Sequence, residues 1–365
     1  MTIYIIELCL ILFLGILYQS KYINKKIFIF LSFTIMALVL GLRGIDVGED
    51  TNHYIDIFNY ARDISWKTVF TSGADTIYNT IWGVNLSVET GYIVLNKFVG
   101  IFTSNGQWFI LISAILTCIL IGKFIYDNSD NAFFATYIFM CEGLYMQSFN
   151  LLRQMLAIAV ALQAYKFIRK ERYKKAVVII LIAFFIHKTS ALFLLLVPLQ
   201  MVKKQQRAVK YVTIVGILVS FLIPVIYQVI SQLIPRYASY LVMNYWESNA
   251  GIGTIMLWIT EILICGIIYY KKIEDNDKDK FITVACTILY LSFELIGLRL
   301  TMFSRVALVF RIFLMFLFPL FASYLSKNTR LWYKIGLLVV VTLSFLSYAS
   351  ADTRLYSFFW QRGSY

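Results

Sequence analysis

Long apolar runs recur along almost the whole of this chain, and they constrain its fold more than any other feature. No polar block between them is large enough to form a soluble domain. Of the 365 residues, 60% are hydrophobic and 15% are charged, whereas soluble domains contain roughly 45 to 50% apolar and about 25% charged residues. The sequence therefore excludes a soluble protein. It predicts a single transmembrane domain over residues 1–365, polytopic and all-α in class.

The basic residues indicate how the chain crosses the membrane. The formal net charge is +13, and much of it falls into clusters between apolar runs, near residues 21–26, 169–175, 203–210, 271–280 and 327–334. Basic loops stay on the cytoplasmic side of a membrane, so topology explains this charge better than binding to nucleic acid does. With all five clusters inside, an even number of crossings separates each pair, and both termini lie outside.

A crossing helix needs about 20 mostly apolar residues, or somewhat fewer when it is tilted. The run 91–103 is too short, so we expect a re-entrant or interfacial helix there. The run 176–201 is interrupted at His187 and predicts two short tilted helices that meet at an outer turn. With these two, we expect about 11–12 transmembrane segments. The clear candidates are residues 3–19, 27–42, 107–126, 132–149, 151–168, 211–234, 253–270, 281–298, 304–325 and 331–350.

This topology places the unusual polar residues on the outer face. The longest polar connection, residues 43–90, is an outer loop that contains seven acidic residues. Arg153 begins a span on that side, and Arg299, Arg305 and Arg311 lie around another outer turn, where positive charge is normally avoided. The planar fork of arginine suits phosphate oxygens, which favours an anionic ligand such as a lipid diphosphate. The alternative is internal pairing with acids: Glu294, Glu261 or Asp50.

Two further residues suggest chemistry on this face. His187 lies in a polar break within an apolar run, and its imidazole can donate to a phosphate or accept a proton near neutral pH. Asp50 follows Arg43 in a glycine-containing turn, from which a carboxylate can position or deprotonate a sugar hydroxyl. A solvated loop would have the same composition. The sequence has no metal-ligand spacing and no glycine-rich phosphate loop, so we expect neither a metal nor a cofactor.

Short motifs occur in order between residue 43 and about residue 305: Arg43 with Gly48 to Tyr54 (GEDTNHY), Glu89 to Tyr92 (ETGY), Arg153-Gln154 with Ala157, Phe185 to Leu192 (FIHKTSAL), and Arg299-Leu300 with Arg305. This ordered set resembles the EpsG-type family of polysaccharide polymerases, relatives of the Wzy O-antigen and capsule polymerases. Two positions depart from the family pattern: Thr90 replaces a proline, and one extra residue separates His187 from Ser190.

The resemblance implies a GT-C-like multi-helix glycosyltransferase at the outer face of a bacterial cytoplasmic membrane. Such an enzyme polymerises lipid-linked repeat units into O-antigen, capsule or exopolysaccharide. The donor would be a growing glycan on undecaprenyl diphosphate, and the acceptor would be one lipid-linked repeat unit. The implied partners are membrane lipids and a polysaccharide chain-length regulator. No metal and no nucleotide sugar would be required, and the stereochemical outcome, inverting or retaining, stays open.

The resemblance also implies roles for individual residues. Asp50 ranks above Glu89 as the group that acts on the acceptor hydroxyl, because its motif includes an arginine. The expected catalytic residues are Asp50, Glu89 and His187. The expected diphosphate-binding residues are Arg43, Arg153, Arg299 and Arg305, which would neutralise the leaving group. Secondary candidates are Gln154, Lys188 and Arg311.

Two other functions fit a polytopic protein with these residues. A flippase or exporter of the same lipid-linked saccharide would use the arginines to line a path, but transporters often have internal repeats and charges near the membrane midplane. The sequence has no convincing repeat, and its polar residues gather at one face. A membrane acyltransferase that modifies surface sugars would also use an intramembrane histidine. It predicts a cytoplasmic acyl-donor site, and the basic clusters there have no accompanying His or Asp pair.

Overall fold

The computed structural model describes residues 1–71, 77–79, 84–86, 88–233, 252–271, 273, 277–350 and 355–361. Helices dominate these residues, which confirms the predicted all-α polytopic membrane class. The strands found among them are β1 (Ile77–Asn79) and β2 (Val84–Leu86), which pair antiparallel. Six of the described helices are long and apolar enough to cross a membrane. They are α1 (Thr2–Gln19), α6 (Gly106–Asn128), α13 (Gln205–Leu233), α15 (Ile252–Tyr270), α16 (Lys278–Gly297) and α19 (Lys327–Ala349).

This number of full-length helices is smaller than the 11–12 segments expected, because several apolar runs fold as two short helices. Hydropathy does not locate such breaks, since apolar residues continue through them. The helix α2 (Lys25–Gly41) is undivided, but with 17 residues it is shorter than the six helices above. The run 132–149 forms α7 (Ala132–Cys141) and α8 (Leu144–Asn150), and the run 151–168 forms α9 (Leu152–Leu162) and α10 (Tyr165–Arg169). The run 304–325 forms α17 (Met302–Arg311) and α18 (Leu314–Ser323). These last two helices are bent by 48° relative to each other, and together they can count as a seventh span.

The two ambiguous runs are both short helices in the structure. The run 91–103 contains α5 (Thr90–Gly100), which has 11 residues and is too short to cross a bilayer. The break predicted at His187 is present, because α11 (Tyr173–Ile186) ends there and His187 has extended backbone. The second half of the run 176–201 is not one continuous α-helix. It begins as the 3-10 helix η1 (Lys188–Leu195) and continues as the short α12 (Leu196–Met201).

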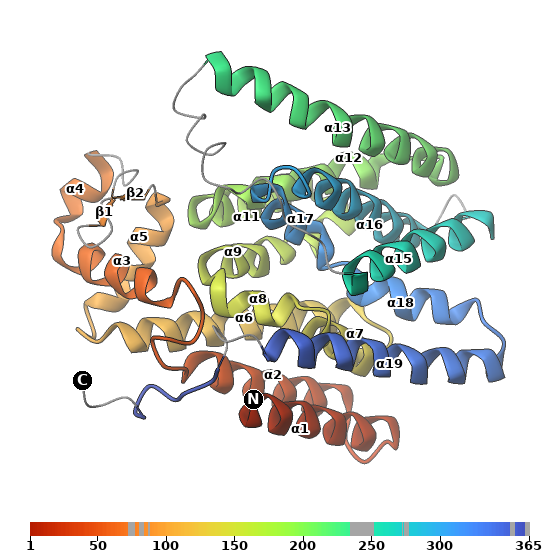
Figure 1. The fold of residues 1–365 in the computed structure, drawn as a ribbon, viewed down its shortest axis with the longest axis horizontal. Helices are drawn as coiled ribbons and strands as arrows, with labels where there is room; N and C mark the ends of the chain where they lie inside the picture. Colours follow the sequence, from red (N-terminus) through yellow and green to blue (C-terminus); the bar gives the residue numbers. More distant parts are fainter. Residues whose placement is uncertain are drawn as a thin grey trace. The chain divides into compact units, whose positions relative to one another are not determined.

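The chain forms two compact units, one of Met1–Leu194 with Val339–Tyr365 and one of Leu195–Leu338. In the first unit, α1 and α2 lie side by side, and α2 packs along α6, which also contacts α9 (Figure 1). In the second unit, α16 packs against α13 and α17. The single domain expected over residues 1–365 stays a prediction.

Residues 43–90, expected as a long polar loop, contain helices in the structure. After a turn, α3 (Thr51–Asp63) and α4 (Trp66–Thr71) precede the two short strands (Figure 1). The buried residues of α3 follow a helical period: Tyr54, Ile57, Phe58 and Ala61. They pack with residues of α5, with the start of α6 and with Leu152 at the start of α9. We call α3, α4 and α5 with this shared core the α3–α5 module.

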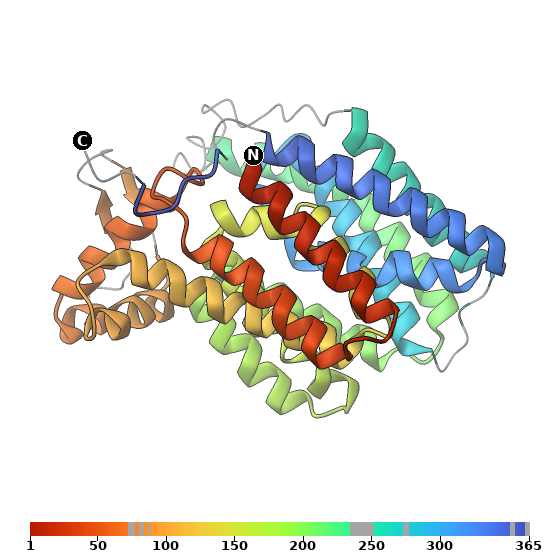
Figure 2. The same cartoon turned by 90° about the horizontal axis from the view of Figure 1, so that it is seen from below.

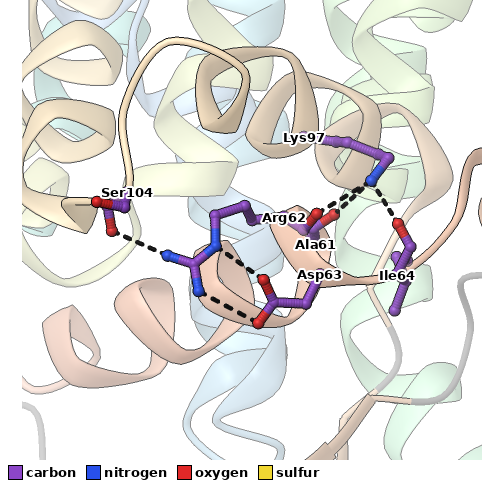
Figure 3. Close-up of polar contacts among 6 residues, drawn as sticks. All are labelled: Ala61, Arg62, Asp63, Ile64, Lys97 and Ser104. Atoms are coloured by element: carbon purple, nitrogen blue, oxygen red, sulfur yellow. Dashed lines mark hydrogen bonds and ion pairs between the residues drawn. The ribbon is translucent and has the colours of Figure 1, made fainter.

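Lys97 of α5 fixes the end of α3 within this module. Its ammonium group donates to the carbonyl oxygens of Ala61, Arg62 and Ile64 (Figure 3), which the last turn of a helix leaves without intrahelical partners. Arg62 in turn donates to the carbonyl oxygen of Ser104, 3.1 Å away, just before α6. These contacts tie α3 and α5 together and join the module to the segment that immediately precedes α6.

Candidate active site

Glu89 and Arg153 form an ion pair in the first unit. Glu89 immediately precedes α5, and its side chain does not cap that helix. Arg153 lies in the first turn of α9, and its Nη1 is 2.9 Å from Glu89 Oε2. The side chains are 9% and 21% exposed, respectively, so the pair is largely removed from water and is weakly screened by salt. The Arg153 side chain keeps some exposure, so its guanidinium can also contact an anion from solution.

The polar break after α11 contacts the same carboxylate. The backbone N–H of Lys188 donates to Glu89 Oε1 over 3.0 Å. His187 Nδ1 is 2.8 Å from Thr189 Oγ1, and Ser190 Oγ donates to the His187 carbonyl oxygen over 2.9 Å. These bonds fix the turn, while the Lys188 side chain is exposed. Glu89 therefore uses its two oxygens to join α9 and the turn at His187.

Gly91 allows this contact between α5 and α11. A Cβ atom at position 91 would lie 2.6 Å from the Phe185 carbonyl oxygen and 2.7 Å from the Phe185 Cβ atom. Real Cβ atoms do not approach backbone so closely, so a larger residue would push the start of α5 away from the end of α11. The glycine of the ETGY motif thus serves a steric purpose that the motif itself does not reveal.

Tyr92 lies behind the ion pair. The Arg153 guanidinium carbon is 5.7 Å from the centre of the Tyr92 ring, a cation–π distance. The ring is fully buried and meets Tyr54 edge to face at 6.4 Å. Burial raises the pKa of Tyr92 far above its ordinary value, so the phenol stays neutral. Tyr92 is part of a motif, but its contact with Arg153 depends on how α5 and α9 pack, which the sequence does not specify.

The turn that contains the acidic motif packs against the junction of α8 and α9. Gly48 has a positive φ of 94° and lies so close to this junction that a Cβ atom would be 2.5 Å from the Phe149 carbonyl oxygen. Tyr54 Oη donates to the carbonyl oxygen of Asn150 over 3.0 Å, and the Glu49 N–H donates to Asn150 Oδ1 over 3.2 Å. The GEDTNHY motif is therefore held next to the start of α9.

Asp50 is the N-cap residue of α3, yet its side chain makes no capping hydrogen bond. It is partly exposed, whereas the neighbouring Thr51 is buried and donates to the Val47 carbonyl oxygen over 2.7 Å. The N-terminus of a helix favours a negative charge nearby. The turn thus fixes the backbone around Asp50 and leaves the carboxylate accessible to a ligand.

Arg43 has a placement that differs from its expected role as a diphosphate ligand. It is fully buried and donates to the carbonyl oxygens of Leu40 and Phe149 over 2.6 and 3.1 Å. Its Nε is 3.4 Å from Thr51 Oγ1. Burial lowers the pKa of Arg43 to about 10. All three guanidinium nitrogens face protein oxygens, which favours a structural role for Arg43, and its expected contact with diphosphate stays a prediction.

The secondary candidates of the first unit differ in exposure. Gln154 is buried, 3% exposed, and faces the packed side of α9. This placement favours a structural role for Gln154. Lys188 is exposed beside the Glu89 carboxylate that its own backbone contacts, so its ammonium group remains accessible to an anion.

The remaining arginines belong to the second unit. Arg299 and Arg305 are exposed around the start of α17. Arg311, the last residue of α17, lies with its guanidinium carbon 5.6 Å from the centre of the Tyr290 ring, and it attracts the Glu294 carboxylate of α16. Internal pairing, one of the two interpretations of these arginines, therefore applies to Arg311.

Four motifs that are widely separated in the sequence thus meet in the first unit: the acidic turn, the ETGY start of α5, the start of α9 and the turn at His187. Among the described residues, no three His, Cys, Asp or Glu side chains are grouped as metal ligands would be.

Comparison with known proteins identifies the family of this chain. The model of the EpsG family matches residues 26–361, nearly the whole chain. No curated protein and no solved structure matches the chain, so its likeness to GT-C folds stays a prediction.

Proposed function

The chain belongs to the EpsG family of polysaccharide polymerases, and we propose that it joins lipid-linked oligosaccharide repeat units at the outer face of a bacterial cytoplasmic membrane. One observation carries this proposal. Four short motifs from distant parts of the sequence meet around the ion pair of Glu89 and Arg153, with a partly exposed carboxylate, Asp50, on a turn held next to the same helix.

The proposed reaction transfers a glycan from undecaprenyl diphosphate to a sugar hydroxyl. The acceptor oxygen forms a bond to the anomeric carbon of the donor, the bond from that carbon to the diphosphate oxygen breaks, and undecaprenyl diphosphate leaves. Asp50 takes the proton of the acceptor hydroxyl. Arg153 neutralises the charge that develops on the departing diphosphate, as fixed donors do in other transferases.

Glu89 and the turn at His187 support this chemistry. Glu89 orients Arg153 through the ion pair and also fixes the backbone at Lys188. When diphosphate binds, the exposed Lys188 ammonium group adds a second positive charge on the same side. His187 donates to the diphosphate or accepts a proton, and Glu89 is the second candidate for the base.

Arg299 and Arg305 stay candidate phosphate ligands of the second unit. Both are exposed at the start of α17, so their guanidinium groups remain accessible. Arg311 has a lower rank because Glu294 and Tyr290 already contact it.

A reconstituted assay tests the proposal. Purified protein in phospholipid vesicles receives an undecaprenyl-diphosphate-linked repeat unit, a chelator and no sugar nucleotide. We expect a ladder of lengthened glycans from the wild type and none from Asp50→Asn. An absolute need for a divalent ion would overturn the arginine-based mechanism. Passage of labelled saccharide across the bilayer without lengthening would instead identify a flippase or exporter.

A further inference from the structure

The C-terminal segment, residues 355–361, lies far from the site in sequence but beside it in the first unit. Figure 2 shows this dark blue segment next to the turn that follows α2. The Gly44 N–H donates to the Ser357 carbonyl oxygen over 2.7 Å, and the Phe359 N–H donates to the Leu42 carbonyl oxygen over 3.0 Å. Together they form an antiparallel bridge between Arg43 and Phe358.

Side chains reinforce this pairing. Tyr356 Oη donates to the carbonyl oxygen of Val39 over 2.9 Å, and the Tyr356 ring meets that of Tyr4 edge to face at 5.7 Å. Gly44 lies so close to the C-terminal segment that a Cβ atom at this position would be 2.6 Å from Ser357 Oγ. The C-terminal segment therefore contacts the end of α2, the start of α1 and the turn that contains Arg43.

The residue at the centre of this bridge also contacts the candidate site. Arg43 donates to Phe149, at the junction before α9, and its Nε faces Thr51, the residue that follows Asp50. A displacement of Arg43 would thus release both the turn of the proposed base and the junction that precedes Arg153. Since a misplacement of about 1 Å costs on the order of 100-fold in rate, the contacts of Arg43 matter for turnover.

We propose that the C-terminal segment is a positioning element for polymerisation: it holds Arg43, and through Arg43 it sets the places of Asp50 and Arg153. This inference rests on the proposed function. No residue of the C-terminal segment touches substrate. The segment acts through backbone hydrogen bonds to the turn that contains Arg43, so we expect their loss to lower kcat per folded molecule.

The first test is a pair of proline variants. Phe359→Pro removes the N–H that donates to Leu42, and we expect kcat per folded molecule to fall by about tenfold or more, with KM little changed. Leu355→Pro is the matched control, because its side chain is exposed and no hydrogen bond of its N–H is found within the described residues. Wild-type kcat for Phe359→Pro would overturn the proposal.

A reversible crosslink separates positioning from folding. Gly44→Cys with Ser357→Cys, in a Cys9→Ser background, places two cysteines side by side at the bridge, because a Cβ atom at position 44 meets the Ser357 side chain. We expect oxidant to close a disulfide between them. When Phe359→Pro is added, oxidation should restore kcat and reduction should lower it again. A variant that fails to fold would not switch in this way. Equal kcat in both redox states would contradict the proposal.

The crosslink also tests the pairing of the C-terminal segment separately from the proposed function. Its formation is read by a mobility shift on a gel and needs no polymerisation assay. Absence of the crosslink would overturn the pairing of the C-terminal segment, whatever the reaction. A crosslink that closes in the double-cysteine variant, while the wild-type protein makes no polymer, would leave the pairing intact and reject the proposed function.

Discussion

At the scale of single residues, arginines with the same charge have different surroundings and therefore different expected roles. Arg43 is fully buried with its nitrogens facing protein oxygens. Arg153 is partly exposed and pairs with one carboxylate oxygen. Arg62 lies at the surface, 2.8 Å from Asp63. These differences make Arg153 the residue whose replacement should affect chemistry most directly.

Arg153→Lys keeps the positive charge but loses the planar fork that binds two phosphate oxygens at once. We expect the rate of polymerisation to fall on the order of 100- to 1,000-fold, the usual effect of removing one such contact. The measurement is the glycan ladder from vesicles that contain equal amounts of protein. Arg62→Lys is the matched control and should leave the ladder unchanged, because lysine can still donate to the Ser104 carbonyl oxygen and the exposed ion pair with Asp63 contributes little. A normal ladder from Arg153→Lys would remove Arg153 from the site.

Amide substitution distinguishes the roles of the two carboxylates near the site, Asp50 and Glu89. Asp50→Asn should abolish turnover and leave the thermal unfolding midpoint near that of the wild type, because its side chain does not cap α3. Glu89→Gln should lower both activity and stability: the amide still accepts a hydrogen bond from Lys188, but the ion pair with Arg153 is lost. If Glu89→Gln abolished turnover at unchanged stability while Asp50→Asn kept activity, the base would be Glu89.

At the scale of elements, the junction between α5 and α11 decides where Glu89 lies. Gly91→Ala should cost about 1 to 3 kcal/mol of unfolding free energy, because the new methyl group meets the Phe185 backbone and forces a shift. Gly100→Ala, in the same helix, is the matched control: its nearest atoms are 3.1 Å away in the flexible Arg62 side chain. Thermal unfolding in detergent measures both. Equal midpoints for the two variants would contradict the close packing of α5 on α11.

At the scale of the whole molecule, the membrane topology is the property most open to test. In a Cys9→Ser background, Lys188→Cys in intact cells should react with a membrane-impermeant thiol reagent, because it is exposed at the turn placed outside. Lys204→Cys is equally exposed but lies in a basic cluster expected in the cytoplasm, so it should react only after permeabilisation. Labelling of Lys204→Cys in intact cells would reverse the orientation.

Composition and charge pattern were sufficient for the class of the molecule, and the motifs were sufficient for the family. The apolar runs predicted an all-α polytopic membrane protein, because a bilayer leaves few alternatives for a chain this apolar. The polar break at His187 also predicted the end of α11, since the helical apolar run stops there. These inferences depend on local properties that each segment carries by itself.

The tertiary structure decided what the sequence left open, because packing brings distant segments into contact. The hydrogen bond from the Lys188 N–H to Glu89 depends on the close approach of α5 to α11 that Gly91 permits. Arg43 matched a motif for phosphate binding, yet its burial favours a structural role. The bridge between Arg43 and Phe358 joins residues more than 300 positions apart through backbone groups. Since every residue carries such groups, no side-chain pattern predicts that pairing.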